Sequence, residues 1–509
     1  MSMHHTVTLL PPMWGHTVGY LHLVVQLLNA EPTLVMTIVQ HKLMVPNMEK
    51  ELSACKYDTK RLRLIGVGDE HVKFDPNSFE VPFTQLLMGW MATIPVLVAG
   101  SLEWPSPQTI HFDFTVGGPV FAPTKAIVGP DVKTVLWYCS NGAAMYVSVS
   151  EYDFAAIFDK IWVDEKARAG RSKEELQLDI CEACNGSDKL TGEVVKILGV
   201  PDMYDYERIS LAAGPPVWHW PILTSGQTLA KGVDGFIAAT GAYIEPVGVP
   251  FLQDYYQKRG QTFFTVGPQT HDKYFKEDPP HEPITNEVVR TFLDSAYATH
   301  GENSVLYISF GSLFFPVANT KHVEALIDIL LVTEPAFPFV FALGSNLGQT
   351  GLSQEFIDRV NASGKGLIAT YWVEQRAILQ HQAVGWFLTH GGFNSITEAL
   401  TLGMPMIIWP AGAEQPGNAA YFSSEPHPVA FEFMQIRTAA QIGPSLRFGD
   451  KLNITGTIED AIQEFEMVLG EARGEKGMML RAHAQGAAKL LRYGRGAEAA
   501  AEIKRLAIF

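Results

Sequence analysis

The sequence predicts an α/β protein made of two parallel-sheet domains that one linker connects. A strand-helix-strand pattern opens the chain, a second alternating series begins after residue 287, and a polar segment with three prolines separates the two. The 509 residues are 47% hydrophobic and 18% charged, which is enough apolar material for two or three domains with cores of their own. A chain of this length has room for a cleft between domains.

The first series shows the β-α-β order that is typical of a parallel sheet. Its expected strands cover residues 6–10, 33–40, 133–140, 235–240 and 262–268, and its first helix covers 20–30. The residues between 140 and 235 are rich in helical patterns. After Pro268 the alternation stops, and residues 269–287 read as a linker because they are polar and have no sustained period.

The second series consists of short β-branched or aromatic runs separated by segments of helical spacing. The runs cover residues 304–312, 337–343, 366–372, 385–390 and 404–410, with helices expected at 321–333 and 394–403. The tail from Lys476 onward is alanine-rich and helical. The expected boundaries are therefore a first domain over 1–268, the linker over 269–287, a second domain over 288–487 and a C-terminal helix over 488–509.

Charge and composition exclude several classes of partner. A formal net charge of −16 repels phosphate backbones and anionic lipid headgroups, so we expect no nucleic-acid partner and no electrostatic attraction to a membrane. The most apolar window, 86–100, is shorter than the ~18 residues of a membrane span and contains Pro95, so we expect a buried helix there. Four cysteines cannot form a disulfide framework, and the N-terminus lacks the pattern of a signal peptide. We expect a cytoplasmic monomer without a membrane anchor.

The stretch FLTHGGFNSITEALTLGMPMIIWP, residues 387–410, predicts a phosphate site. A buried strand leads through a glycine turn into a helix, where Ser395 and Glu398 have the S-x-x-E spacing of a capping box. Free backbone N–H groups and the positive end of the helix dipole attract anions, and Gly391 and Gly392 allow close approach. A neutral His390 can donate a hydrogen bond to a phosphate oxygen, although a histidine of the core is the alternative interpretation.

The longer window over residues 371–420 resembles the signature box of the family 1 glycosyltransferases. These inverting enzymes move a sugar from a uridine diphosphate sugar to small acceptors, and about fifty contiguous residues match their order of Trp, Gln, His, Gly, Asn-Ser, Glu and an acidic-Gln pair. The resemblance implies a GT-B fold, which has two facing Rossmann-like domains and a C-terminal helix that crosses back to the first. It places the acceptor pocket mainly in the first domain and the donor pocket mainly in the second.

The resemblance also implies a role for each matched residue. Trp372 would stack on uracil, with Val373 and Gln375 near the base and ribose; Ser312, His390, Gly392, Asn394 and Ser395 would contact the diphosphate; Glu398 would bind the ribose; and Glu414 and Gln415 would bind the sugar. For Glu398, the helix cap stays open as an alternative. A glutamine at the last of these positions indicates UDP-glucose as the donor.

Some positions depart from the plant pattern of this family. Val373 and Glu374 stand where plant members usually have Ala-Pro, and Phe393 replaces a tryptophan. Gly391 stands where many members have cysteine. These differences favour a non-plant member, fungal or microbial.

A second match lies in the first domain, where residues 11–28 resemble the family loop that carries the general base. His16 matches the base, and its place at the start of a helix favours the neutral ring that accepts a proton. A carboxylate is expected to orient the ring, and Asp113 matches that position, with Asp131 as the alternative. The sequence contains no D-x-D motif, so we expect direct displacement at the anomeric carbon without a metal ion or a cofactor.

The sequence leaves more than one possibility for the acceptor and for the activity. Richness in Met, Trp and Phe in the first domain favours a lipophilic acceptor such as a phenol, flavonoid, terpenoid or sterol. A non-catalytic UDP-sugar-binding protein is a second hypothesis, and a UDP-sugar epimerase or hydrolase on a related scaffold is a third. The presence of both His16 and Asp113 favours the transferase.

Overall fold

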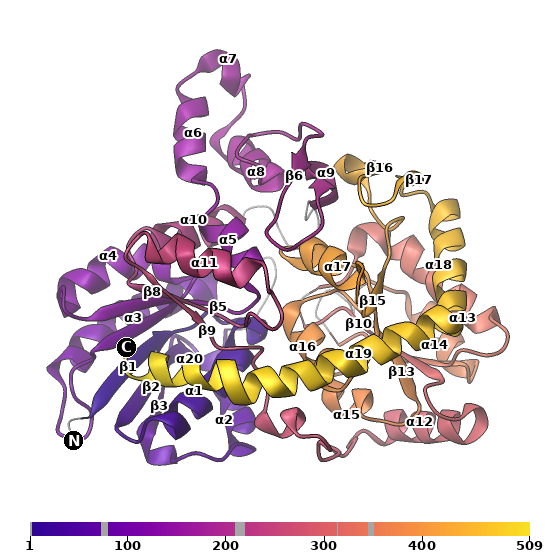
Figure 1. Cartoon of the computed structure of the whole chain (residues 1–509), viewed down its shortest axis with the longest axis horizontal. Helices are drawn as coiled ribbons and strands as arrows, with labels where there is room; N and C mark the ends of the chain where they lie inside the picture. Colours follow the sequence, from indigo (N-terminus) through magenta and orange to yellow (C-terminus); the bar gives the residue numbers. More distant parts are fainter. Residues whose placement is uncertain (1–2, 73–79, 209–218, 313, 345–350) are drawn as a thin grey trace. The chain divides into compact units, whose positions relative to one another are not determined.

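The computed structural model describes residues 3–72, 80–208, 219–312, 314–344 and 351–509. The chain forms two compact units (Figure 1). The first unit consists of Met1–Lys189, Gly214–Asp272 and Tyr493–Phe509, and the second of Leu190–Ala213 and Lys273–Arg492. The segment Leu190–Ala213, which the expected boundaries place in the first domain, is thus part of the second unit.

The first unit is built on a seven-stranded parallel sheet with the strand order β3-β2-β1-β4-β5-β8-β9. The strands are β1 (His4–Leu9), β2 (Leu34–His41), β3 (Leu62–Val67), β4 (Thr109–Asp113), β5 (Lys133–Tyr138), β8 (Gly235–Ala238) and β9 (Thr262–Thr265). Leu9 is paired with Phe112, so the carboxyl ends of β1 and β4 lie side by side. The predicted parallel α/β fold is confirmed.

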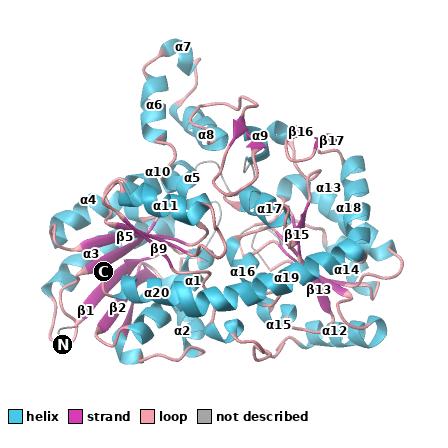
Figure 2. Cartoon of the chain, viewed as in Figure 1, coloured by secondary structure: helices cyan, strands magenta, loops and turns pink. Residues whose placement is uncertain are grey.

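Helices cover both faces of this sheet (Figures 1 and 2). One face carries α1 (Trp14–Ala30), α2 (Val45–Ser53) and the C-terminal α20 (Ala500–Ala507), which packs against α1. The other face carries α3 (Glu80–Ala99), α4 (Gly117–Val128), α10 (His219–Ala230) and α11 (Gly248–Gln257). Between β5 and β8 the chain also forms α5 (Gly142–Val149), α6 (Phe154–Trp162), α7 (Glu165–Arg168) and α8 (Lys173–Ala183).

Helix α3 corrects the expectation of a buried helix at 86–100. Leu86, Trp90 and Ile94 are buried against the sheet, but only 28% of the apolar window of the helix is buried. Among the described residues, α3 is the one helix whose length and composition would allow it to cross a membrane. The prediction failed because one apolar face packs and the opposite face, equally apolar, points outward.

The second unit is built on a six-stranded parallel sheet with the order β12-β11-β10-β13-β14-β15. Its strands are β10 (Val305–Ser309), β11 (Phe339–Ala342), β12 (Gly366–Ala369), β13 (Val384–Thr389), β14 (Met406–Ile408) and β15 (Ala430–Glu432), and its helices include α12 (Glu287–His300), α13 (Thr320–Val332), α14 (Gln354–Ala362), α15 (Gln375–Leu379), α16 (Phe393–Thr401), α17 (Gln415–Ser423), α18 (Ile458–Ala472) and α19 (Glu475–Gly494). The remaining α9 (Asp205–Arg208) and the strands β6 (Val194–Val195), β7 (Met203–Tyr204), β16 (Gly443–Ser445) and β17 (Gly449–Ile454) also belong to this unit.

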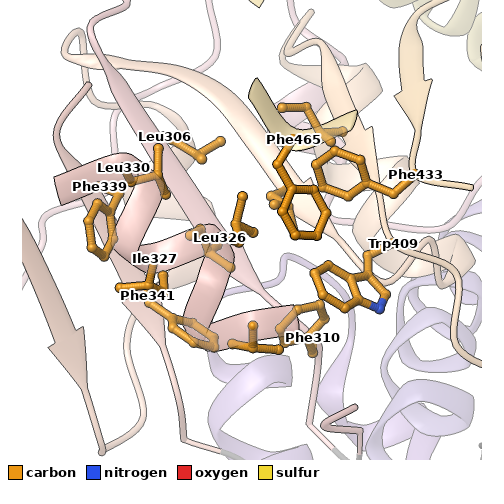
Figure 3. Close-up of a cluster of buried hydrophobic side chains, with 14 of the residues drawn as sticks. Leu306, Phe310, Leu326, Ile327, Leu330, Phe339, Phe341, Trp409, Phe433 and Phe465 are labelled. Atoms are coloured by element: carbon orange, nitrogen blue, oxygen red, sulfur yellow. The ribbon is translucent and has the colours of Figure 1, made fainter. Parts of the chain in front are cut away.

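An aromatic cluster fixes the strand ends of the second unit (Figure 3). Trp409, directly after β14, meets Phe310, directly after β10, with ring centroids 5.6 Å apart. The same indole stacks on Phe465 of α18 at 5.8 Å. Because these rings are buried beside the loops that leave the strands, they hold the loops at the carboxyl edge of the sheet.

The described part of the segment Leu190–Ala213, residues 190–208, is anchored to the second unit by a buried carboxylate. Glu207 of α9 accepts hydrogen bonds from Ser445 Oγ at 2.7 Å and from the backbone N–H of Leu446 at 2.8 Å. Helix α9 also packs against α17. A stretch that precedes β8 in sequence therefore supports a helix of the second unit.

Candidate active site

The first unit brings His16 and Asp113 together. His16 is the third residue of α1, and Asp113 is the last residue of β4. Nδ1 of His16 lies 3.0 Å from Oδ2 of Asp113, whose side chain is fully buried. Asp131, the alternative partner, is exposed on the loop before β5. The structure thus selects Asp113 over Asp131 as the carboxylate that contacts the histidine.

Neighbouring groups fix both members of the pair. The second oxygen of Asp113, Oδ1, accepts hydrogen bonds from the backbone N–H of Thr115 at 2.9 Å and from its hydroxyl at 2.6 Å. The His16 ring stacks on Phe114 with centroids 5.4 Å apart, and Trp137 donates a hydrogen bond to the His16 carbonyl at 3.2 Å. With Nδ1 turned to the carboxylate, Nε2 is the nitrogen that can take a proton from a substrate.

The protonation of His16 differs from the expectation. Burial lowers the pKa of His16, but the neighbouring Cys139 and the Asp113 carboxylate raise it more, and the pKa lies well above the usual 6.5. The predicted neutral ring near pH 7 is therefore wrong, because the interactions with Cys139 and Asp113 together outweigh the effect of burial. Cys139, a hydrogen-bond partner of the ring directly after β5, was missed, since nothing in the sequence marks a single cysteine as a neighbour of residue 16.

The second unit gathers the predicted diphosphate residues around two loops. His390 follows β13 and lies between two glycines: a Cβ atom at Gly392 would be 2.4 Å from His390 Nε2, and one at Gly311 would be 2.8 Å from Cε1. Gly311 also has a φ of 80°, which L side chains rarely adopt. The loop after β10 therefore brings Gly311 to the histidine, and the predicted Ser312 is the next residue of this loop. Burial lowers the pKa of His390 to about 4, so the ring is neutral at pH 7 and has one N–H to donate.

The start of α16 corrects the predicted capping box. The helix begins at Phe393, Gly392 is its N-cap residue, and no side chain caps it. Ser395 and Glu398 are then the third and sixth residues of the helix, so the cap interpretation of Glu398 is wrong. Asn394 and Ser395 lie in the first turn, where backbone N–H groups have no intrahelical acceptor.

Glu398 instead belongs to a polar cluster with Gln375. The amide Nε2 of Gln375 donates to Glu398 Oε2 at 2.7 Å and to Ser395 Oγ at 3.4 Å. Tyr307 of β10 donates to the other end of that amide at 3.4 Å. The structure thus joins three predicted ligand residues from α15 and α16 into one hydrogen-bonded group.

Trp372 and Val373, three and two residues before Gln375, have opposite surroundings. The side chain of Trp372 is 67% exposed within the structure, which leaves a face of the indole available to a planar base. The Val373 side chain is buried, so it packs inside the unit and only its backbone is left for contact with a ligand.

The loop before α17 holds the predicted sugar residues. Glu414 is the N-cap residue of α17 and Gln415 its first residue. Oε1 of Gln415 accepts hydrogen bonds from the backbone N–H groups of Ala411 at 2.9 Å and Gly412 at 2.8 Å, so the side chain also shapes its own loop. Asn418, which sequence reasoning missed, donates to the Gly391 carbonyl at 2.9 Å and ties α17 to the glycine turn.

The predicted site residues therefore form two groups, one in each unit. The first unit holds His16 and Asp113, and the second holds Ser312, Trp372, Val373, Gln375, His390, Gly392, Asn394, Ser395, Glu398, Glu414 and Gln415. Within the described parts of both units, no group of three or more His, Cys, Asp or Glu side chains is arranged to hold a metal ion.

The fold and these two groups define a glycosyltransferase of the GT-B class. Two solved structures are similar to nearly the whole chain, and each is 18% identical to it over 99% of this chain and 98% of its own. The first is Medicago truncatula UGT71G1 complexed with UDP-glucose, with a TM-score of 0.68. The second is a UDP-glucosyltransferase from Polygonum tinctorium, with a TM-score of 0.65. At this identity the likeness supports the fold.

Sequence comparison supplies the family. Residues 280–442 match the model of the UDP-glucoronosyl and UDP-glucosyl transferase family. The UDP-glycosyltransferase eriJ of *Hericium erinaceus* is 27% identical over 92% of this chain and 90% of its own length. The solanidine UDP-glucose glucosyltransferase 1 of *Solanum tuberosum* is 35% identical over 36% of this chain and 35% of its own. The chain belongs to the UDP-glycosyltransferase family, and it is an enzyme that transfers a sugar from a UDP-sugar to a small-molecule acceptor.

The contact between His16 and Asp113 predicts the pH dependence of the reaction. Because Cys139 and the Asp113 carboxylate raise the pKa of His16, its neutral ring forms in the wild type only as pH rises through a value above 6.5. In Asp113→Asn the pKa falls, so the acidic limb of kcat/KM moves to lower pH, while the plateau drops on the order of 10²- to 10⁴-fold. Asp131→Asn is the matched control and should behave as wild type. Identical acidic limbs in wild type and Asp113→Asn would contradict the assignment.

The packing of His390 between glycines predicts that one added methyl group weakens the binding of UDP. Gly392→Ala places a Cβ atom against the imidazole and displaces it, so the Kd for UDP should rise roughly tenfold or more. Gly470→Ala in α18 meets no atom within 4 Å and should leave the Kd unchanged. Isothermal titration calorimetry measures both variants, and equal affinity in the two would refute the role of this contact.

Proposed function

We propose that the enzyme transfers glucose from UDP-glucose to a hydroxyl group of a small lipophilic acceptor, with inversion at the anomeric carbon. The observation that carries the proposal is the hydrogen bond of His16 to the buried Asp113, which is the arrangement that a general base for a hydroxyl group needs. Gln415 at the start of α17 supports glucose as the sugar, as do the UDP-glucose named with UGT71G1 and the glucosyltransferase activity named for the potato relative.

Proton transfer begins the proposed reaction. Nε2 of neutral His16 takes the proton of the acceptor hydroxyl while its oxygen attacks the anomeric carbon from the face opposite UDP. The positive charge that the imidazole gains is stabilised by Asp113, 3.0 Å from Nδ1. One displacement breaks the bond between the sugar and the β-phosphate as the new bond forms, so the configuration inverts.

The leaving diphosphate takes up negative charge during this step. The N–H of neutral His390, the first turn of α16 and the hydroxyl groups of Ser312 and Ser395 are the donors that would stabilise it. These groups supply the electrostatic stabilisation that a metal ion provides elsewhere, so we extend the proposal to a metal-independent reaction. The proposal also includes a cytoplasmic, monomeric enzyme, and the similarity to the *Hericium erinaceus* protein along almost the whole chain supports a fungal source.

Acceptor class follows from the aromatic character of the first unit. The relatives named for solanidine and nuatigenin, and a *Phytolacca americana* structure complexed with pterostilbene, support terpenoid, sterol-like and phenolic acceptors. These compounds combine one reactive hydroxyl group with an apolar body.

A mass-spectrometric screen tests the proposal. Purified enzyme with UDP-glucose and a panel of phenolic, terpenoid and sterol acceptors should give products heavier by one hexose residue. His16→Ala should abolish product while leaving UDP affinity intact, and His300→Ala, an exposed histidine at the end of α12, should retain full activity. Binding of UDP without transfer to any acceptor would favour the non-catalytic alternative, and loss of UDP binding in His16→Ala would refute its role as base.

A further inference from the structure

Two adjacent helices of the first unit present an apolar surface without charge. We define the α3–α4 face as the exposed side chains of these helices beyond Glu80: Val81, Thr84, Met88, Ala92, Pro95, Val96 and Ala99 of α3, and Pro119, Ala122, Pro123, Ala126 and Ile127 of α4. Thr84 is the one polar member. Surface helices of soluble proteins normally direct charged residues to water, so this composition indicates an interaction site.

The helices are held rigidly with these residues outward. Leu86, Trp90, Ile94 and Leu97 of α3 are buried, and the indole N–H of Trp90 donates to Thr124 of α4 at 2.9 Å. Both helices lie on the same face of the sheet (Figure 1) and pack against each other. Met88 is 69% exposed and Val96 is 71% exposed.

Charged groups are confined to the margins of the face. Glu80 begins α3, and Glu103 follows its end. Lys125, the one cation of α4, is half-buried, and its ammonium donates to the Val132 carbonyl at 2.9 Å. Leu102, just beyond α3, is 100% exposed and extends the apolar character past the helix.

We propose that the α3–α4 face binds the surface of a neutral lipid bilayer. Apart from Thr84, its exposed side chains are Val, Ile, Met, Ala and Pro, whereas protein interfaces concentrate Tyr, Trp and Arg at their centres. A hydrocarbon phase requires neither hydrogen-bond partners nor complementary charge, and this face offers no charge and only one hydroxyl group, that of Thr84. The composition of α3 reaches that of a membrane helix, but its buried side holds it on the sheet, so it lies along the interface rather than across it.

The charge of the whole chain selects the type of lipid. A net charge of −16 opposes approach to anionic headgroups, so apolar burial is the driving force and zwitterionic lipid is the preferred surface. The inference does not depend on the sugar or the acceptor, because the face contains none of the predicted site residues.

Vesicle co-sedimentation tests the inference on the full chain. Wild type should sediment with pure phosphatidylcholine vesicles and less with vesicles that also contain phosphatidylserine. Met88→Glu/Val96→Glu should lower the partition coefficient at least about tenfold, because it places two carboxylates against hydrocarbon. Met467→Glu/Met478→Glu is the control variant, because it adds the same charge at two exposed methionines of the second unit. Its partition coefficient should be close to that of the wild type.

A second variant is expected to strengthen binding, a result that a loss of protein stability would not explain. Ala92→Trp enlarges the apolar face at an exposed position and should raise the partition coefficient. UDP affinity, measured in solution, should be equal in all variants, which separates this inference from the proposed function. Absence of wild-type binding to phosphatidylcholine, binding only to anionic vesicles, or a dimer that Met88→Glu/Val96→Glu dissociates without any vesicle binding would overturn it.

Discussion

The contact between His16 and Asp113 depends on the parallel pairing of β1 with β4. β1 and β4 are hydrogen-bonded neighbours although almost a hundred residues separate them, so the loop that begins α1 and the end of β4 meet at one edge. A helix start and a strand end are rigid supports; Thr115 holds the Asp113 carboxylate, Phe114 stacks on the His16 ring, and Trp137 holds the backbone carbonyl of His16. The proposed base is therefore positioned by a helix and a strand of the fold.

In the second unit, neighbouring parallel strands bring the proposed nucleotide-binding residues together in the same way. His390 follows β13 and Gly311 follows β10, and these strands are also adjacent and parallel. The aromatic packing of Trp409 with Phe310 holds the neighbouring strand ends, and Asn418 links α17 to the glycine turn. Each unit therefore places its polar groups at the carboxyl ends of parallel strands, where α/β folds bind ligands.

Sequence reasoning succeeded where the information is local and periodic. The alternating patterns predicted both parallel sheets. Two pairs of residues that the family resemblance named, His16 with Asp113 and Gln375 with Glu398, are in contact in the structure. It failed where a local property depends on residues that are distant in the sequence. The start of α16 depends on Gly392, although the S-x-x-E spacing also fits a cap. The raised pKa of His16 depends on Cys139 and Asp113, which are both distant from it in the sequence. The position of Leu190–Ala213 depends on Glu207 and on Ser445, 238 residues later.

Product stereochemistry tests the central claim most directly, because a single displacement assisted by His16 permits one outcome. The sugar of UDP-glucose is α-linked, so attack from the opposite face gives a β-glucoside. The anomeric proton coupling in the NMR spectrum of the freshly formed product distinguishes the two configurations. A large coupling, typical of the β-linkage, is the result that the account predicts, and an α-glucoside formed with retention would contradict it.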